Sequence, residues 1–374
     1  MPQDTITVNL IHETLDIKNV NYYQPLLVYK CAKVKLASST PKVKILHLNI
    51  NNFEKLIDTL EKEGSNDETE FNNEKAYLKR ALCAFFSYGD AGLRSVKLLI
   101  YKESTAAQAI KTELIQNRNT FITLINTYSS DGGDGITLYK DDYTHFKDDK
   151  HFFVFATKES EIKSLFIDAT NTKSRIIVIH SKAEEHLNLR FISKYLHEAS
   201  IFHAANPYGV KFSGMHPITD SDTISKLRSA NINFYSLLNE TGLDGIPAFK
   251  EGVTLDGSPI DEIFTYHYIK YELTSKLIRV WNFNNRANSK LSSLQLNGKR
   301  DNAYTTALEC TLKTFIDQGI IVSYKDLSTK INPSTNLDLS LSVGIIYNFS
   351  MNSVTLNITS QDIGDYLNTH NRRS

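Results

Sequence analysis

The sequence predicts a chain of two layered parts, an α/β domain followed by an α+β domain, with extended strand arms at both ends. Strand-like and helix-like segments alternate across residues 25–205, which is typical of layers built on a largely parallel sheet. After Pro207 the pattern changes to short strands, a Gly-rich stretch and long helices. We therefore predict an N-terminal arm over 1–24, an α/β domain over 25–205, an α+β core domain over 206–358 and a C-terminal arm over 359–374.

The elements of the first half follow from the spacing of apolar residues. Strands are expected over 26–35, 43–50, 94–101, 152–156 and 175–180, and helices over 51–63, 76–88, 106–129, 159–169 and 183–198. The polar, acidic stretch 64–73 is expected to be a loop. The strand at 175–180 is apolar and β-branched almost throughout, as strands buried on both faces are.

The second half is expected to hold fewer and longer elements. We predict a helix over 221–230, a strand over 231–238, a Gly-rich stretch over 242–257, a helix from Ile260 to about Trp281 and a helix over 301–318. The segment 339–359 is strongly β, and we expect its parts 345–349 and 354–358 to close the fold as a hairpin.

Composition excludes several classes of protein. The chain has 374 residues, enough for about two domains. Lys+Arg and Asp+Glu both number 42, so the formal net charge is zero and no basic excess favours nucleic acid. No apolar run reaches the roughly 18 residues of a membrane span, and the first residues do not resemble a secretory signal. The three cysteines are widely spaced, as expected in a reducing compartment.

The search for catalytic and cofactor motifs gives only weak candidates. Phosphate-binding glycine loops, zinc-protease motifs and nucleophile elbows are absent from the sequence. The run Asp131–Gly135 could hold a hard cation but is typical of an exposed turn. His180 could lie at the carboxyl edge of a sheet, and Asp261 with Glu262 could act as an acid–base pair, although acidic residues favour any first helical turn. We expect no catalytic residue, metal or cofactor.

Several segments, in their order along the chain, resemble the sheath proteins of contractile phage tails and related injection machines. The first is the apolar run 82–86, followed by a Gly-containing turn and the strand 96–100. The second leads from a helix into Asn231-Ile232-Asn233-Phe234-Tyr235. The third, 249–263, is similar to a run that enters the long helix of sheath proteins, and its matching residues are Gly252, Thr254, Gly257, Ile260, Asp261 and Ile263.

The resemblance implies a structural protein without enzymatic activity. Residues 25–205 would form an outer domain and 206–358 the inner sheath core domain. Its partners would be copies of itself in stacked hexameric rings, a tail tube protein, and baseplate and tail terminator proteins, without direct nucleic acid contact or stable membrane insertion. It would be assembled in the bacterial host cytoplasm and reside in the virion tail sheath.

The arms would connect neighbouring subunits. Ile6, Val8 and Leu10 alternate, so they share one face of a strand that is too short to be stable alone. Ile363, Tyr366 and Leu367 are the apolar anchors of the C-terminal arm. We predict that at least one arm adds a strand to another subunit. The alternative hypothesis is a soluble α/β enzyme or small-ligand-binding protein with a cleft at the carboxyl edge of its sheet.

Overall fold

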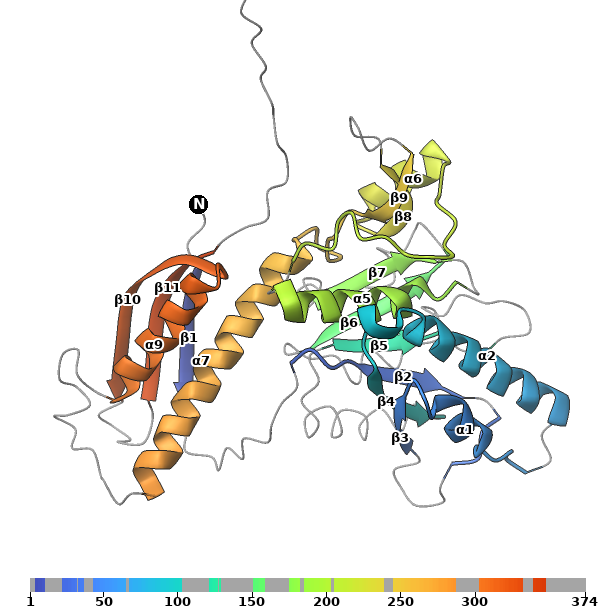
Figure 1. The fold of residues 1–374 in the computed structure, drawn as a ribbon, viewed down its shortest axis with the longest axis horizontal. Helices are drawn as coiled ribbons and strands as arrows, with labels where there is room; N and C mark the ends of the chain where they lie inside the picture. Colours follow the sequence, from blue (N-terminus) through green and yellow to red (C-terminus); the bar gives the residue numbers. More distant parts are fainter. Residues whose placement is uncertain are drawn as a thin grey trace, which may run out of the picture.

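The fold is that of a computed structural model. It describes residues 4–10, 22–31, 33–36, 43–64, 67–102, 121–126, 128, 151–158, 175–181, 185–202, 205–238, 245–286, 303–331 and 339–347. Helices and strands form two bodies joined by one long helix, α7 (Figure 1). The predicted combination of helices with parallel and antiparallel sheet is confirmed.

The larger body is built on a six-stranded sheet with strand order β3-β4-β2-β5-β6-β7. All neighbouring pairs are parallel except β3 with β4, so β3 is an antiparallel edge. The strands are β2 (Leu26–Lys30), β3 (Val43–Asn49), β4 (Ser95–Tyr101), β5 (Phe121–Ile125), β6 (Phe152–Thr157) and β7 (Ile176–His180). β5 and β6 are buried at every position, which explains their continuous apolar sequences.

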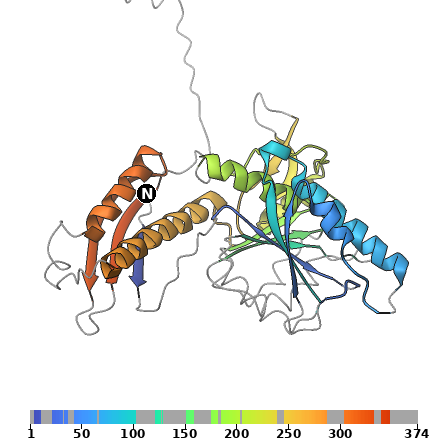
Figure 2. The same ribbon diagram turned by 60° about the horizontal axis from the view of Figure 1, so that its bottom comes forward.

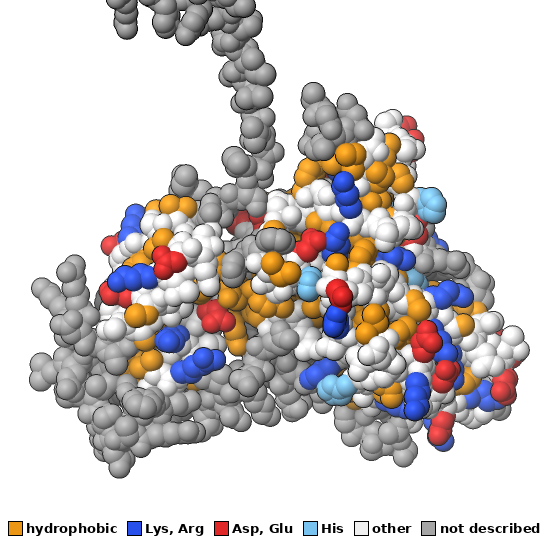
Figure 3. Space-filling model, in the orientation of Figure 1, with side chains coloured by type: hydrophobic (Ala, Val, Ile, Leu, Met, Phe, Trp, Pro, Cys, Tyr) orange, Lys and Arg blue, Asp and Glu red, His pale blue; other side chains and the backbone are white. Residues whose placement is uncertain are grey.

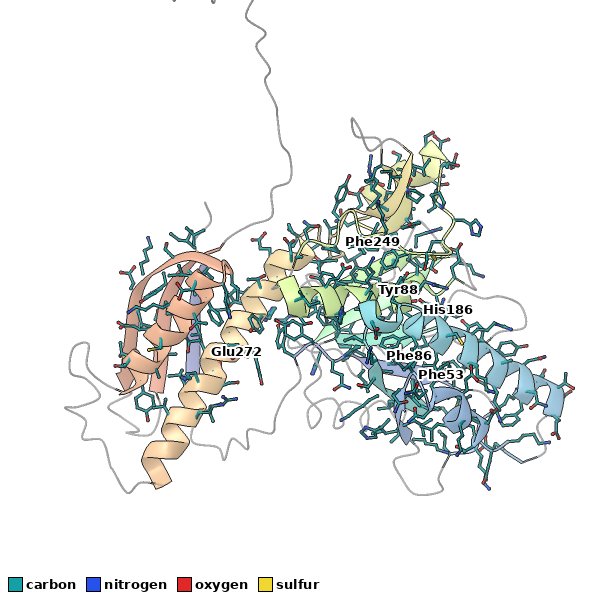
Figure 4. The ribbon with its side chains drawn as sticks, in the orientation of Figure 1. Phe53, Phe86, Tyr88, His186, Phe249 and Glu272 are labelled. Atoms are coloured by element: carbon teal, nitrogen blue, oxygen red, sulfur yellow. The ribbon has the colours of Figure 1, made fainter. Side chains whose placement is uncertain are left out.

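One face of this sheet is covered by helices α2 and α5, as Figures 1 and 2 both show. On this side lie α1 (Phe53–Asp58), α2 (Glu68–Phe86), the 3₁₀ turn η1 (Gly89–Ala91) and α5 (Leu187–Phe202). Figure 4 shows Phe53 and Phe86 together in this layer, with ring centroids 5.2 Å apart. The burial of this apolar face is the main stabilising term of the larger body.

The opposite face of the sheet is covered in part by residues that come much later in the chain. These include residues of α6 (Ser221–Ser229) and β8 (Phe234–Leu238). Strand β9 (Ile246–Lys250), which pairs with β8, packs on the other side, where the Phe249 ring stacks on Phe191 of α5. Leu227, Phe234 and Leu255 share a buried cluster with Val28 and Val178 of the large sheet. Described residues that follow position 206 therefore pack on the α/β body. The predicted domain division at residue 206 stays a prediction.

The smaller body joins the two ends of the described chain. It contains α9 (Ala303–Asp317), β10 (Ile321–Ile331), β11 (Leu339–Tyr347) and β1 (Asp4–Leu10), in the sheet order β1-β11-β10. Its core combines Leu273 and Leu277 of α7 with Leu308 of α9 and Val343 and Ile345 of β11. In Figure 1 the blue strand β1 lies beside the red β11.

Three predicted elements need correction. Helix α2 begins at Glu68 inside the expected loop, because the Asp67 carboxylate caps it by accepting from the Thr69 amide at 2.6 Å. Strand β5 lies within the expected helix 106–129, since periodicity cannot distinguish a short buried strand from a helix. β9 lies within the Gly-rich stretch. The structure describes the pairing of β10 with β11. The predicted hairpin of 345–349 with 354–358 stays a prediction, because 354–358 lies outside the described residues.

Candidate assembly site

The motif that resembles a sheath protein forms a tight connection between β9 and α7. We call residues 251–259 the junction loop. Gly252 and Gly257 have φ angles of +68° and +91°, in the left-handed region that favours glycine. A Cβ atom on Gly252 would lie 3.0 Å from Oδ1 of Asn206 and 3.2 Å from Cγ of Pro207. The first glycine of the motif is therefore required by both its backbone angle and a close neighbour.

The polar residues of the junction loop bind one another. The Asp256 carboxylate accepts from the Thr254 hydroxyl at 2.5 Å and from the Ser258 amide at 3.1 Å. The Thr254 amide donates to the Ser258 carbonyl at 2.9 Å, and Thr254 is fully buried. These bonds satisfy polar groups that burial would otherwise leave without partners.

Asn233 ties the junction loop to the large sheet. Its side-chain amide donates to the carbonyls of Val178, at 3.0 Å, and Val253, at 2.7 Å, and its Oδ1 accepts from the Val253 amide at 2.9 Å. Asn231 donates to the Leu255 carbonyl at 3.1 Å. The second and third sequence segments, 20 residues apart, thus meet at the end of β7.

Tyr235, which completes the second segment, also makes a structural contact. Its hydroxyl donates to the Phe212 carbonyl at 3.0 Å and accepts from the Phe212 amide at 3.2 Å. Both contacts engage the Tyr235 hydroxyl in internal hydrogen bonds. The segment therefore acts as a clamp between the connecting chain and the sheet.

The last motif residues begin α7 (Ile260–Arg286). The Ile260 amide donates to the Gly252 carbonyl at 2.9 Å, and the Ile260 side chain is fully buried. Asp261 lies in the first turn, is 7% exposed, and accepts from the Asn206 side chain at 3.5 Å. Ile263 is half-buried against the main core. The residues at this end therefore anchor the helix, and Asp261 complements its N-terminus.

Helix α7 belongs to both cores. Phe264 lies in the core of the larger body, where its ring is 5.2 Å from that of Tyr22. Ile269, Leu273 and Leu277 lie in the core of the smaller body, and Tyr268 packs against both. Figure 2 shows the helix running from one body to the other. A space-filling view shows hydrophobic side chains gathered between the bodies (Figure 3).

A half-buried cationic residue marks the place where α7 crosses the sheet. Nη2 of Arg175, directly before β7, lies 3.3 Å from Nδ1 of His267. The His267 ring also packs edge-on against Phe152, with centroids 5.6 Å apart. Burial lowers the pKa of His267 to about 3, and the Arg175 and Lys270 charges lower it further. His267 is therefore neutral at physiological pH and accepts from the guanidinium. The amino-acid sequence gave no signal of this contact between Arg175 and His267.

The terminal sheet, β1-β11-β10, is the second part of the candidate site. Seven residues of β1 pair antiparallel with β11, from Asp4 opposite Ile345 to Leu10 opposite Leu339. Ile6 is opposite Val343 and Val8 opposite Leu341. Val343, on the partner strand, is fully buried. The register thus aligns the alternating positions of β1 with β11 along the whole length of β1.

Both edges of this sheet are formed by strands with one partner among the described residues. β1 pairs with β11, and β10 pairs with β11 on the other side. β10 carries an irregularity between Lys325 and Ser328, where Asp326 has a φ of +55°. The C-terminal anchors Ile363, Tyr366 and Leu367 lie outside the described residues, so their pairing stays a prediction.

The carboxyl edge of the large sheet is the place where the alternative hypothesis puts a ligand. The order β4-β2-β5-β6-β7 reverses beside β2, as in doubly wound folds with a ligand crevice there. Here the Glu74 carboxylate reaches this edge from α2 and accepts from the Tyr29 hydroxyl at 3.0 Å and the Lys33 amide at 2.9 Å. These internal hydrogen bonds thus use polar groups at the sheet edge where a ligand would bind.

Two histidines lie near this edge. His180 ends β7, is half-buried, and its amide donates to the Asn233 carbonyl at 2.7 Å. His186 is buried beside Tyr77, and burial, with the Arg190 and Arg80 charges, lowers its pKa to about 4. Figure 4 shows His186 beside the helical layer. Asp131–Gly135 lies outside the described residues. Within the described part of the chain, no three His, Cys, Asp or Glu side chains are grouped to hold a metal ion.

Among the residues described above, none of the helices has the length and apolar character needed to cross a membrane.

Comparisons with known proteins give two family matches. The model "DUF787, N-terminal domain" matches residues 1–257, and "DUF787, C-terminal domain" matches residues 260–371. Their boundary falls in the junction loop, directly before α7. No curated protein matches the chain. A similar solved structure is that of the sheath tail protein Lin1278 from Listeria innocua, at 10% identity and a TM-score of 0.45, over 69% of this chain and 61% of that chain.

Proposed function

This chain belongs to the DUF787 family, whose two domains it carries in order, and we propose that it is a structural subunit of a contractile tail sheath. In this proposal the subunit assembles with copies of itself as stacked hexameric rings around a tail tube protein. Baseplate and tail terminator proteins lie at the ends of the polymer, which resides in the virion tail. Contraction of the polymer drives the tube through the host envelope.

The observation that carries the proposal is the terminal sheet. β1 pairs with β11, which lies more than 300 residues later in the chain. A strand so distant in sequence from its partner can leave its own sheet and add to the same edge of another copy, because the hydrogen bonds and register are identical in both. The pairing within one chain therefore supplies a ready-made connection between subunits.

The junction loop supports the same role. Its motif residues make internal contacts that hold α7 rigidly on the large sheet, through Asn233 and the Ile260 amide. A rigid body with exchangeable strands is what a contracting lattice needs, since the subunits rotate while main-chain connections persist. Energy stored at assembly would drive contraction without nucleotide hydrolysis.

A disulfide experiment tests strand exchange. Cys83 and Cys310 are exposed and are first replaced by Ser. Val8→Cys and Leu341→Cys, which are opposite each other in the register, are then introduced together. We expect oxidised monomers to cross-link within one chain and oxidised tubes to give covalent ladders on a non-reducing gel.

The control places the cysteines out of register, as Val8→Cys with Val343→Cys, and should cross-link less efficiently in both states. Tubes whose cross-links stay within single chains would refute strand exchange. A protein that forms no rings or tubes by electron microscopy would refute the sheath role itself.

The second candidate function is small-ligand binding at the carboxyl edge. The observation in its favour is the reversal of strand order beside β2. Glu74, however, is 1% exposed and already accepts two hydrogen bonds there. A compact monomer that retains a small molecule through purification, detected by native mass spectrometry, would favour this candidate over the sheath.

A further inference from the structure

A groove of about 310 Å³ runs between α7 and α9 in the smaller body. Its floor is partly apolar and its rim is charged. Six of its lining residues are Tyr268, Glu272, Lys276, Arg279, Cys310 and Phe315. Figure 4 shows Glu272 midway along α7. The groove is separate from the terminal sheet and from the junction loop.

The groove has a defined charge pattern. Lys276 and Arg279 lie three residues apart on α7, so they are neighbours on one helix face. Glu272 lies one turn earlier, and burial raises its pKa although Arg279 opposes the shift. An occupant with two acidic groups near Lys276 and Arg279 would match this rim.

The chain leaves the described structure next to this groove. Tyr347, the last residue of β11, pairs with Ile321. Ile321 follows Gln318, which lines the groove, by three residues. The 27 residues after Tyr347 therefore start at one end of the groove. A 15-residue linker spans up to about 50 Å when extended, so residues beyond 362 can reach any point of it.

The C-terminal sequence complements the groove. Ile363, Tyr366 and Leu367 have the i, i+3, i+4 spacing of one helix face. Asp362 and Asp365 are also three apart, as are Lys276 and Arg279. Short amphipathic segments bind helical grooves through such anchors.

We propose that, before assembly, the groove between α7 and α9 holds the chain's own segment Asp362–Leu367. Ile363, Tyr366 and Leu367 contact the apolar floor near Tyr268 and Phe315, and the two aspartates face Lys276 and Arg279. In the free subunit the C-terminal arm therefore binds its own chain, as β1 pairs with its own β11. This docking does not require that the protein form a sheath.

Cys310 is a native probe of the groove, because it lines the groove and is an exposed free thiol. Cys83 is replaced by Ser, which leaves Cys310 and the buried Cys31, whose pKa burial raises to about 12. Alkylation of Cys310 is then measured on unassembled protein. We expect it to be about tenfold slower than in the Ile363→Asp/Leu367→Asp variant, as for a segment docked about nine-tenths of the time.

Three comparisons make the test decisive. Thr369→Asp/Asn371→Asp adds the same charge to the tail outside the anchors and should keep Cys310 protected. Lys276→Glu/Arg279→Glu should remove protection, and Asp362→Lys/Asp365→Lys should restore it; the truncation 1–358 corrects each rate for the intrinsic reactivity of the thiol. Equal rates with and without the segment would overturn the proposal. Protection that disappears on dilution would also overturn it, because the segment would then come from another copy.

Discussion

At the scale of single residues, buried polar side chains hold the candidate site together. Asn233 is fully buried and makes three hydrogen bonds that join β7 to the junction loop. Asn206 lies against Gly252 and donates to the Asp261 carboxylate. Thr254 donates to the Asp256 carboxylate. The motif residues therefore serve geometry, and substitution should change stability before it changes assembly.

The substitution Asn233→Ala should lower the free energy of unfolding by about 3 kcal/mol. It leaves the Val253 carbonyl and amide without their side-chain partner, and unsatisfied buried groups cost about 1–3 kcal/mol each. The Val178 carbonyl keeps its bond from the Asn233 backbone amide, at 2.9 Å. Urea unfolding followed by circular dichroism measures the change. Asn72→Ala, at an exposed position of α2, is the control. A loss below about 1 kcal/mol would show that the Asn233 hydrogen bonds are not needed to hold the junction loop.

The substitution Gly252→Ala should destabilise the fold more than Gly214→Ala. Both glycines have positive φ, which costs an alanine about 1–2 kcal/mol. A Cβ at Gly252 also meets Asn206 at 3.0 Å, whereas nothing lies within 4 Å of one at Gly214. The difference in unfolding free energy between the two variants isolates this contact. Equal losses would mean that Asn206 moves aside without cost.

At the scale of elements, α7 is the part on which both bodies depend. Its first turns pack on the ends of β5, β6 and β7 through Phe264 and His267, and its later turns pack on α9. The packing of a neutral His267 beside Arg175 is favourable only while the histidine stays unprotonated. The packing of α7 should therefore respond to acid.

Stability should fall as the pH decreases from about 6.5 toward 4, the range between the pKa of an unfolded histidine and those of His267 and His186. The folded pKa values are lowered, so the unfolded chain binds more protons in this range and gains stability relative to the fold. His267→Gln, which can still accept from Arg175, should show a smaller loss between pH 7 and pH 5. His47→Gln, at an exposed position of β3, should keep the original slope. An unchanged slope for His267→Gln would contradict the buried neutral histidine.

At the scale of the whole molecule, the chain forms two bodies and closes its ends into one of them. The boundary between the DUF787 domain matches, at 257 and 260, lies at the junction loop. Leu227, Phe234 and Leu255 cover part of the second face of the large sheet. The outward placement of 25–205 in a tail stays a prediction.

Deletion of residues 1–20, or of 360–374, should leave a folded monomer that no longer polymerises. Among the described residues, the large core contains none from 1–20, and Val343 and Ile345 remain covered by α7 and α9. Residues 360–374 lie outside the described part of the chain. Circular dichroism and light scattering report folding and monomer size, and negative-stain microscopy reports tubes. Normal tubes from both truncations would contradict a role for the arms. An aggregated or unfolded product would instead assign β1 to the stability of the single chain.

The sequence by itself determined most element types, the β character of Thr5–Leu10 and the entry of the run from Gly252 to Ile263 into a long helix. These depend on local pattern: alternation, helical spacing and glycine before a capped helix. Only the tertiary structure decided that Asn233 and Asn206 hold the junction loop, that Arg175 meets His267, and that β1 pairs with β11. Such contacts join residues tens to hundreds of positions apart, and neither a buried hydrogen bond nor a strand's partner leaves a periodic signal. The cover of the second sheet face belongs to the same class, because a sheet with two apolar faces does not specify which later segment covers the second one.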